Sequence, residues 1–331
     1  MLLKRLSITL FVVLSILLGT SSVYAADVLL GGDSIGIELN YDGVVITGTY
    51  DISIDNKPYD PSSDGFVSGD LIKAVNNQTV KSISDLMTII ESDIEKEKPI
   101  LLTIQRDGQT FIQELKIQYN QKQFSTGLYV QDGLSGIGTM TYYNPTNKQF
   151  GALGHIMYDS KLSNDIPLNQ GKVYNSFIKR IRPSENGQPG EKVGEIGSVE
   201  IGTVFENNNF GIYGSYIDSQ VTNKDIISTA SMDEVKKGDA YFLTVLNGHD
   251  IQKCHIKITH LKKQNQPDIK GITFEVVDKE VLKQTNGIVQ GMSGSPIIQD
   301  GKLIGCVTHV DVNNVKIGYG LYIDWMLQNN N

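Results

Sequence analysis

Cysteine and proline are scarce in this sequence of 331 residues. Cys254 and Cys306 are its only cysteines, too few for a disulfide framework, and nine prolines without internal repeats argue against collagen-like, solenoid and disordered chains. Basic residues are also in deficit, 29 against 37 acidic ones, so the formal charge of −8 disfavours nucleic acids and anionic membranes as partners. The remaining composition, 40% hydrophobic with 33 glycines, is that of a globular protein of about two domains.

The sequence has one long apolar run, and it lies at the N-terminus. Leu6 to Leu18 follow a basic start and precede small residues that end at Ala25, which are the three zones of a secretory signal. The run is shorter than the roughly 20 residues that span a bilayer. We therefore predict a signal peptide over residues 1–26 and export across the cytoplasmic membrane, with a retained membrane anchor as the alternative. Export would place both cysteines in an oxidising environment, and the sequence leaves their redox state open.

Residues 33–118 form one unit of short strands, glycine turns and one helix. The helix is predicted to begin at Ser82, because Ser82 and Asp85 can form a capping box. An Asp107-Gly108 pair further along predicts a hairpin between two strands. The apolar residues of the helix recur with helical spacing at Ile83, Leu86, Ile90 and Ile94.

This order of elements resembles a PDZ domain, which is a peptide-binding module. The pattern Gly-Asp-Leu-Ile-x-x-Val-Asn that begins at Gly69 is similar to that of secreted bacterial PDZ domains. The resemblance implies that Ser34, Ile35, Gly36 and Ile37 form a carboxylate-binding loop, beside a groove that accepts an extended chain by strand addition. The alternative is a small α+β domain that only packs against its neighbour.

A polar connector at residues 119–126 separates this unit from residues 127–331. Beyond the connector, short β-type runs alternate with turns such as Asn247-Gly248 and Asp300-Gly301, and residues 252–260 alternate between apolar and polar over most of their length. Many short strands at this spacing indicate a sandwich or barrels. The predicted fold class is therefore mainly β: an α+β PDZ domain followed by a chymotrypsin-like double β-barrel serine peptidase domain.

The block Gly291-Met-Ser-Gly-Ser-Pro is the strongest candidate for chemistry. A tight glycine loop between strands lets Ser293 project its hydroxyl, while the amides of Gly291 and Ser293 can form an oxyanion hole. The nucleophile elbow of an α/β-hydrolase does not fit, because Ser295 replaces its last glycine and Pro296 leads into a strand. The alternative is an ordinary turn rich in glycine and serine.

A serine nucleophile needs a base, and five histidines are available. His155 directly follows a strand-like segment in the region of the first barrel, which favours it as the base. His255 and His260 lie on opposite faces of one alternating strand, so they are poor partners for each other and for a metal. His249 is expected in an exposed turn, and His309 in the cleft or core. Acyl transfer by serine and histidine needs no metal and no cofactor, and none is expected.

Together, these residues resemble the sporulation stage IV B peptidases (SpoIVB peptidases) of endospore-forming bacteria, over nearly the whole chain. The family's nucleophile and base occupy the positions of Ser293 and His155 in the matching blocks. The resemblance implies Asp278 as the third member of a catalytic triad, with Asp159, four residues after His155, as the alternative. The matching blocks are Gly136-Ile-Gly-Thr-Met-Thr, Gly151-Ala-Leu-Gly-His, Gly187-Gln-Pro-Gly-Glu-Lys, Gly211-Ile-Tyr-Gly and the residues from Gly287 to Val310.

The resemblance implies an exported signalling serine endopeptidase that works between the forespore and mother-cell membranes. Members of the family cleave a membrane-associated regulator of an intramembrane protease, which then processes pro-sigma-K. They also cleave themselves, and the PDZ domain guides this self-recognition. The expected partners are therefore protein or peptide substrates and no nucleic acid. The alternatives are a catalytically silent PDZ-type peptide-binding scaffold and a general envelope quality-control protease, although the latter usually carries its protease domain first.

Overall fold

A computed structural model describes residues 26–96, 98–120, 123–160, 162, 166, 168 and 170–328. Apart from Ala26, the predicted signal peptide lies outside these residues. Within the ranges given, no helix is both long and apolar enough to cross a bilayer.

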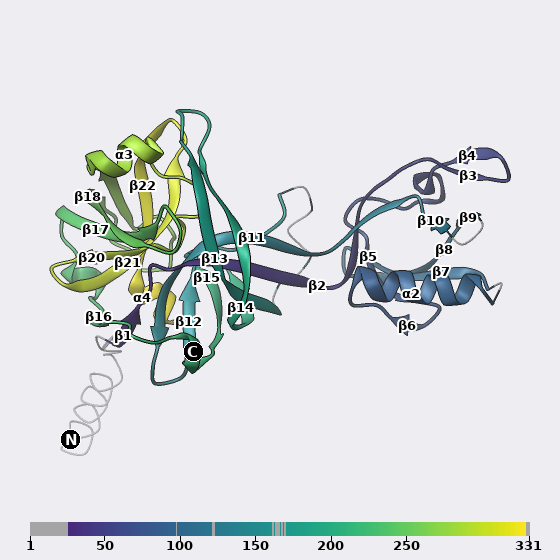
Figure 1. The fold of residues 1–331 in the computed structure, drawn as a ribbon, viewed down its shortest axis with the longest axis horizontal. Helices are drawn as coiled ribbons and strands as arrows, with labels where there is room; N and C mark the ends of the chain where they lie inside the picture. Colours follow the sequence, from purple (N-terminus) through teal and green to yellow (C-terminus); the bar gives the residue numbers. More distant parts are fainter. Residues whose placement is uncertain are drawn as a thin grey trace, which may run out of the picture.

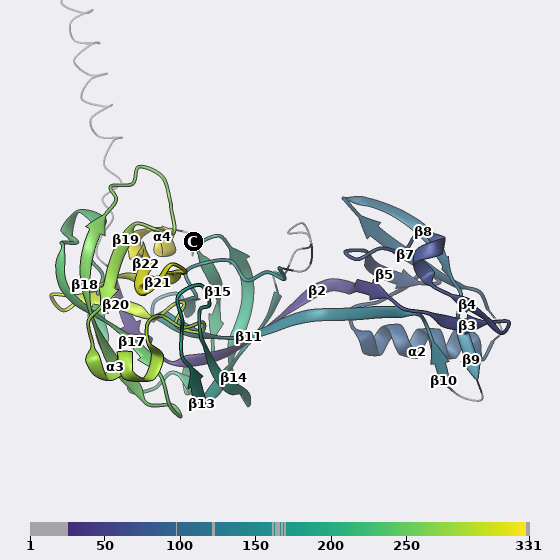
Figure 2. The ribbon, with the colours of Figure 1, turned by 90° about the horizontal axis from the view of Figure 1, so that it is seen from above.

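Two long antiparallel strands, β2 (Ser34–Thr49) and β11 (Leu128–Asn144), run through both halves of the described chain. Figure 1 and Figure 2 show them as a ribbon that joins a large lobe to a smaller one. The pairing is interrupted between Gln131 and Gly133 of β11, opposite Gly43. Gly43 has a φ of 144°, a conformation that favours glycine. This bulge marks the point where the chain passes from one lobe to the other.

Six strands of the large lobe close into a first barrel, in the order β2-β11-β12-β15-β14-β13. Alternate apolar residues of β2, such as Ile35 and Ile37, point into its core. The edge strands β1 and β16 extend the sheet beyond β11. The strands other than β2 and β11 are β1 (Asp27–Leu30), β12 (Gln149–Ala152), β13 (Gln170–Arg182), β14 (Glu191–Asn208), β15 (Gly211–Tyr216) and β16 (Ile226–Ser228).

A second closed barrel follows in the order β17-β18-β19-β22-β21-β20. Its apolar core includes Phe242, Ile256 and Phe274. The structure thus confirms the expected fold, which is mainly β with a double barrel. The elements are η2 (Asp218–Gln220), η3 (Met232–Glu234), β17 (Gly238–Val245), β18 (Ile251–Leu261), β19 (Ile272–Val276), α3 (Lys279–Thr285), β20 (Pro296–Gln299), β21 (Lys302–Asp311), β22 (Asn314–Tyr322) and α4 (Ile323–Gln328).

The small lobe packs the helix α2 (Ile83–Ile94) against a sheet. The predicted capping box is confirmed: the Ser82 hydroxyl accepts from the Asp85 amide, and the Asp85 carboxylate accepts from the Ser82 amide, both at 3.1 Å. Leu86 and Ile90 then reach the lobe's own core. The other elements are β3 (Ile52–Ile54), β4 (Lys57–Tyr59), η1 (Pro61–Asp64), β5 (Leu71–Val75), β6 (Gln78–Thr79), β7 (Ile100–Arg106), β8 (Gln109–Leu115), β9 (Gln118–Asn120) and β10 (Gln123–Ser125).

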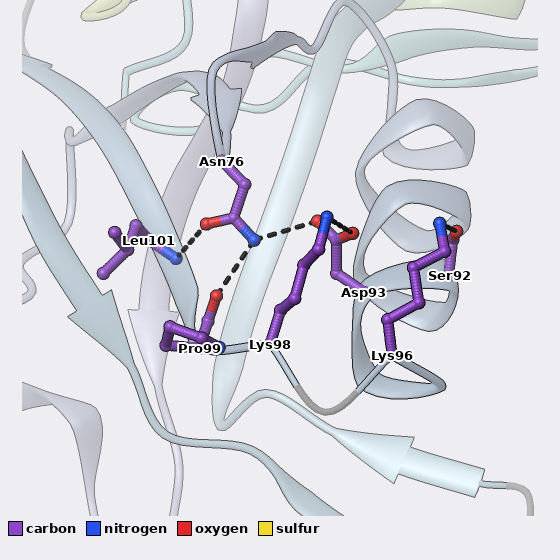
Figure 3. Close-up of polar contacts among 7 residues, drawn as sticks. All are labelled: Asn76, Ser92, Asp93, Lys96, Lys98, Pro99 and Leu101. Carbon is purple, nitrogen blue, oxygen red and sulfur yellow. Dashed lines mark hydrogen bonds and ion pairs between the residues drawn. The ribbon is translucent and has the colours of Figure 1, made fainter.

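A polar clamp joins three elements of this lobe, as Figure 3 shows. The Asn76 side chain, in the turn after β5, donates to the Asp93 carboxylate at 2.8 Å and to the Pro99 carbonyl at 2.9 Å, and accepts from the Leu101 amide at 3.0 Å. Asp93 is buried at the end of α2 and also faces Lys98 at 3.5 Å. Because each buried polar atom has a partner, the clamp fixes the helix end against β5 and β7.

The structure contradicts the prediction that Ser34, Ile35, Gly36 and Ile37 form a carboxylate-binding loop. All four are buried in β2, within the first barrel. Ile35, Gly36 and Ile37 pair with β11 on one side and with β13 on the other. Because both edges of the strand are already paired, its amides are not available to an added peptide. The apolar alternation that suggests a PDZ loop instead fills the core of the first barrel.

The boundaries of the small lobe also differ from residues 33 and 118, the bounds predicted for the first domain. The first half of β2 belongs to the large lobe, and the small lobe begins near Gly43. The expected connector at 119–126 includes a short hairpin, in which β9 pairs with β10. The small lobe ends within β11, where Leu128 still packs in its core.

Candidate active site

The nucleophile loop, residues 290–295, lies between the two barrels. The Thr139 amide of the first barrel donates to the Ser293 carbonyl at 3.0 Å, and the Gly294 amide donates to the Val307 carbonyl of the second at 2.8 Å. Gly294 has a φ of 87°, and a Cβ atom there would lie 2.1 Å from the Thr139 carbonyl oxygen. Only glycine therefore allows this close approach of the loop to β11.

The Ser293 side chain is partly exposed, as a nucleophile must be. Its Oγ donates to the Thr308 carbonyl of β21 at 3.1 Å. This bond holds the Ser293 hydroxyl against β21 of the second barrel. Ser295, by contrast, is fully buried, so the predicted choice of Ser293 over Ser295 fits the geometry.

His155 follows β12 through a tight turn in which Leu153 and Gly154 have φ values of 66° and 71°. Leu153 packs against Gly294, so this turn contacts the nucleophile loop directly. The His155 Nδ1 lies 2.8 Å from the Ile156 carbonyl oxygen. A carbonyl can only accept, so Nδ1 carries the proton and Nε2 keeps a free lone pair. That tautomer is the one a general base needs.

The environment of His155 keeps its imidazole neutral. Burial lowers the pKa of His155, and the hydrogen bond to Ile156 only partly opposes this effect. The His309 ring lies with its centroid 5.3 Å from that of His155. Burial, followed by the nearby His155 and Lys270, lowers the pKa of His309 to about 4. His309 directly follows Thr308, the residue whose main-chain carbonyl accepts from Ser293.

Two amides of the nucleophile loop are available to a substrate oxygen. The amides of Gln290, Met292, Gly294 and Ser295 all donate to main-chain carbonyls. Those of Gly291 and Ser293, the predicted oxyanion hole, donate to no group within the described part of the chain. A groove of about 470 Å³ borders Gly291. Residues 135–137 of β11, 191–194 of β14 and 290–291 of the loop line this groove.

The structure does not bring Asp278 to His155. Asp278 is the N-cap of α3, where its carboxylate accepts from the amides of Glu280 at 3.1 Å and Val281 at 3.2 Å. It also accepts from the His255 amide at 3.2 Å. The Ile156 carbonyl is the hydrogen-bond partner of His155 Nδ1, which is the role that the acid of a triad would take. The assignment of Asp278 as the acid stays a prediction.

Asp159, the alternative acid, lies in the segment after His155. Burial, and to a smaller extent the charge of Asp159, raises the pKa of the Tyr41 hydroxyl to about 12, so Asp159 lies near the middle of β2. In the described ranges, no three side chains of His, Cys, Asp or Glu gather as a metal-binding group. Cys254 and Cys306 are buried free thiols, and burial raises the pKa of both.

A double β-barrel with a partly exposed serine on a glycine loop and a histidine on a neighbouring turn is the architecture of chymotrypsin-like serine peptidases. The sequence comparison gives the family, because residues 122–327 match the SpoIVB peptidase S55 family. The chain belongs to this family and is a serine peptidase.

The solved structures that match this chain include crystal structures of one mycobacterial protease. The active form of the Rv3671c protease of M. tuberculosis is 13% identical, with a TM-score of 0.33, over 60% of this chain and 73% of that one. The inactive form of a serine-to-alanine mutant of Rv3671c from M. tuberculosis H37Rv is 13% identical, with a TM-score of 0.32, over 58% and 80% of the two chains. No curated protein sequence matches the chain.

The low pKa of His155 predicts the pH range of activity. The base must be neutral, so the rate is lost as pH falls through the His155 pKa, which lies below its ordinary value of 6.5. The second-order rate of labelling by a fluorophosphonate should therefore lose half its plateau value below pH 6.5. His309→Gln is the control, because burial is the main cause of the shift at His155 and the midpoint should stay below 6.5. A midpoint above pH 6.5 in the wild type would contradict the assignment of His155 as the general base.

Proposed function

We propose that this chain is an exported signalling serine endopeptidase that cleaves a membrane-associated regulator of an intramembrane protease, and also cleaves itself. One observation carries the catalytic part. The hydrogen bond from His155 Nδ1 to Ile156 leaves Nε2 as a base, on a turn that contacts the loop of Ser293. Membership of the SpoIVB peptidase family supports the signalling part.

The proposed chemistry is acyl transfer in two steps. His155 Nε2 takes the proton as Ser293 Oγ attacks the scissile carbonyl, and the developing oxyanion accepts from the amides of Gly291 and Ser293. The protonated His155 then gives its proton to the leaving amine, which breaks the peptide bond. Water hydrolyses the acyl-serine by the same steps in reverse order.

The small lobe suggests how self-recognition works. In PDZ-type recognition, an extended peptide adds as an antiparallel strand beside a helix. Residues 128–131 of β11 pair with residues 45–49 of β2, which supports such a position for them. The Asp132 carboxylate accepts from the Ile83 amide at the start of α2, at 2.8 Å. We propose that the small lobe binds its own chain in cis, so an outside peptide would have to displace β11.

The localisation and pathway are proposed from family membership. The enzyme would be exported into the space between the forespore and mother-cell membranes. There, cleavage of the regulator would release the intramembrane protease that processes pro-sigma-K. The acidic charge of −8 agrees with a surface that avoids nucleic acids.

Labelling and proteolysis test this proposal together. A fluorophosphonate should label the wild type and not Ser293→Ala, and the wild type should cut a co-expressed membrane-bound regulator at few sites, which mass spectrometry of the fragments would reveal. The mature N-terminus of the enzyme should also differ between the two proteins. Absence of labelling in the folded wild type would indicate a silent scaffold. Degradation of casein to many fragments would indicate a quality-control protease.

A further inference from the structure

Lys192 is an unusual residue for a protein interior. It lies on β14 with only 6% of its surface exposed. Its Nζ donates to the Thr244 hydroxyl at 2.8 Å and lies 3.3 Å from the Thr139 hydroxyl. Neither partner is a carboxylate. Burial of an amine without a counter-ion is costly, so the fold gives up stability to keep Lys192 at this place.

The Lys192 side chain packs directly against the nucleophile loop. The side-chain carbons of Lys192 lie against Gly291, since a Cβ atom there would be 3.0 Å from the Lys192 Cδ. The Lys192 amide donates to the Gln290 carbonyl at 2.9 Å. Thr139, which contacts the Nζ, donates from its own hydroxyl to the Gly291 carbonyl at 2.8 Å. The Thr139 amide donates to the Ser293 carbonyl at 3.0 Å.

A chain of hydrogen bonds therefore runs from the second barrel, through Lys192, to the loop. It begins at Thr244 of β17, passes through the Lys192 Nζ and the Thr139 hydroxyl, and ends on the Gly291 carbonyl. The Gly291 carbonyl shares its planar peptide unit with the Met292 amide, whereas the Gly291 amide shares one with the Gln290 carbonyl, which accepts from the Lys192 amide. The contacts of Thr139 and Lys192 therefore fix the peptide units on both sides of Gly291. The Gly291 amide belongs to the predicted oxyanion hole, and Gly291 and Lys192 both border the groove.

We propose that Lys192 is a positioning residue that fixes the backbone on both sides of Gly291 as the oxyanion hole requires: its main-chain amide holds the Gln290 carbonyl, and its amine acts through Thr139 on the Gly291 carbonyl. The lysine acts on the reaction through the loop and does not touch the substrate. Burial lowers the pKa of Lys192 to about 7, so the amine can stay in place without a counter-ion near neutral pH. The proposal rests on the serine peptidase activity and names a residue that supports it.

Two variants each remove a different group from this series of hydrogen bonds. Lys192→Met keeps the apolar stem and removes the amine, while Thr139→Val keeps the shape and the amide of Thr139 and removes the hydroxyl. Each should lower the maximal rate of fluorophosphonate labelling of Ser293 by about 10²-fold, as expected when the reacting groups are misplaced by about 1 Å. The apparent affinity for the probe should change little. The labelling rate of the double variant should fall by about the same factor as that of either single variant.

Matched controls separate positioning from general damage. Thr139→Ser restores the hydroxyl and should label at close to the wild-type rate. Lys172→Met removes an exposed lysine that pairs with Glu200 at 2.6 Å on β13 and β14, and its rate should not change. Circular dichroism and thermal unfolding report whether each variant is folded.

The outcomes distinguish the proposal from the function on which it rests. If the folded wild type is not labelled at all, the peptidase assignment fails. If the wild type is labelled and both Lys192→Met and Thr139→Val react at its rate, the positioning role of Lys192 is wrong. Should Lys192→Met fail to fold, Thr139→Val decides alone, and a rate within about threefold of the wild type overturns the proposal.

Discussion

Ser293→Ala should abolish proteolysis and leave the fold intact. Its Oγ is the nucleophile, and removal of that atom lowers kcat by roughly 10⁶-fold in serine peptidases. The side chain is partly exposed, and among the described residues its hydroxyl bonds only to the Thr308 carbonyl, so its loss creates no large cavity. His155→Ala should cause a similar loss, and the double variant should lose no more than either single one, because the two residues act as a unit. Cleavage of the regulator and thermal unfolding measure the two effects.

Ser295→Ala is the matched control within the same loop. Ser295 is fully buried, and its Oγ finds no hydrogen-bond partner in the described part of the chain. Removal of a buried hydroxyl without a partner costs little and can even stabilise the fold. Ser295→Ala should therefore keep its activity. If Ser295→Ala were inactive and Ser293→Ala active, the nucleophile would have to be reassigned.

Features that depend on neighbouring residues could be predicted from the sequence. The capping box at Ser82 and Asp85 needs residues only three apart. The Asp107-Gly108 hairpin needs two adjacent residues with positive φ, which are 49° and 75°. The nucleophile loop is of the same kind, because Gly291 and Gly294 supply the backbone conformations that expose Ser293.

Features that depend on distant pairing could not be predicted in this way. The alternation of Ile35 and Ile37 fits a groove strand and a barrel strand equally well, and only the partners β11 and β13 decide between them. Asp278 stands before Lys279 and Glu280 in a sequence that also fits a helix cap, and the structure shows that cap. An N-cap carboxylate at this position leaves the identity of the triad acid to experiment.

Lys192 illustrates the limit most clearly. Lys192 is the last residue of the block Gly187-Gln-Pro-Gly-Glu-Lys, which contributes to the family resemblance, so the sequence does mark this segment. A lysine in a polar stretch is ordinarily exposed, and its burial follows only from contacts with Thr139 and Thr244, about 50 residues away on other strands. Thr139 and Thr308 lie within the matching blocks, but the bond from the Thr139 hydroxyl to the Gly291 carbonyl and the bond from Ser293 to the Thr308 carbonyl depend on tertiary pairing, which the sequence does not show.

Gly36→Val should damage the peptidase body itself. A Cβ atom at Gly36 would lie 2.5 Å from Cγ2 and 2.9 Å from Cβ of Ile196, so the two strands would have to move apart. Overpacking of this kind costs about 1 to 3 kcal/mol. The melting temperature should fall accordingly. Cleavage of a short peptide and of the natural protein target should fall by the same factor, because both depend on the same barrel.

The comparison of the two substrates decides where Gly36 acts. A residue in a recognition groove of the small lobe would affect the protein target far more than a short peptide, since the lost contacts would lie remote from the scissile bond. Gly43→Val is the matched comparison at the bulge between the lobes, where a Cβ atom would meet the Ile72 carbonyl oxygen of the small lobe at 2.5 Å. It should strain the small lobe and affect the short peptide less. A selective loss of the protein target in Gly36→Val would return this residue to a recognition role and contradict its place in the first barrel.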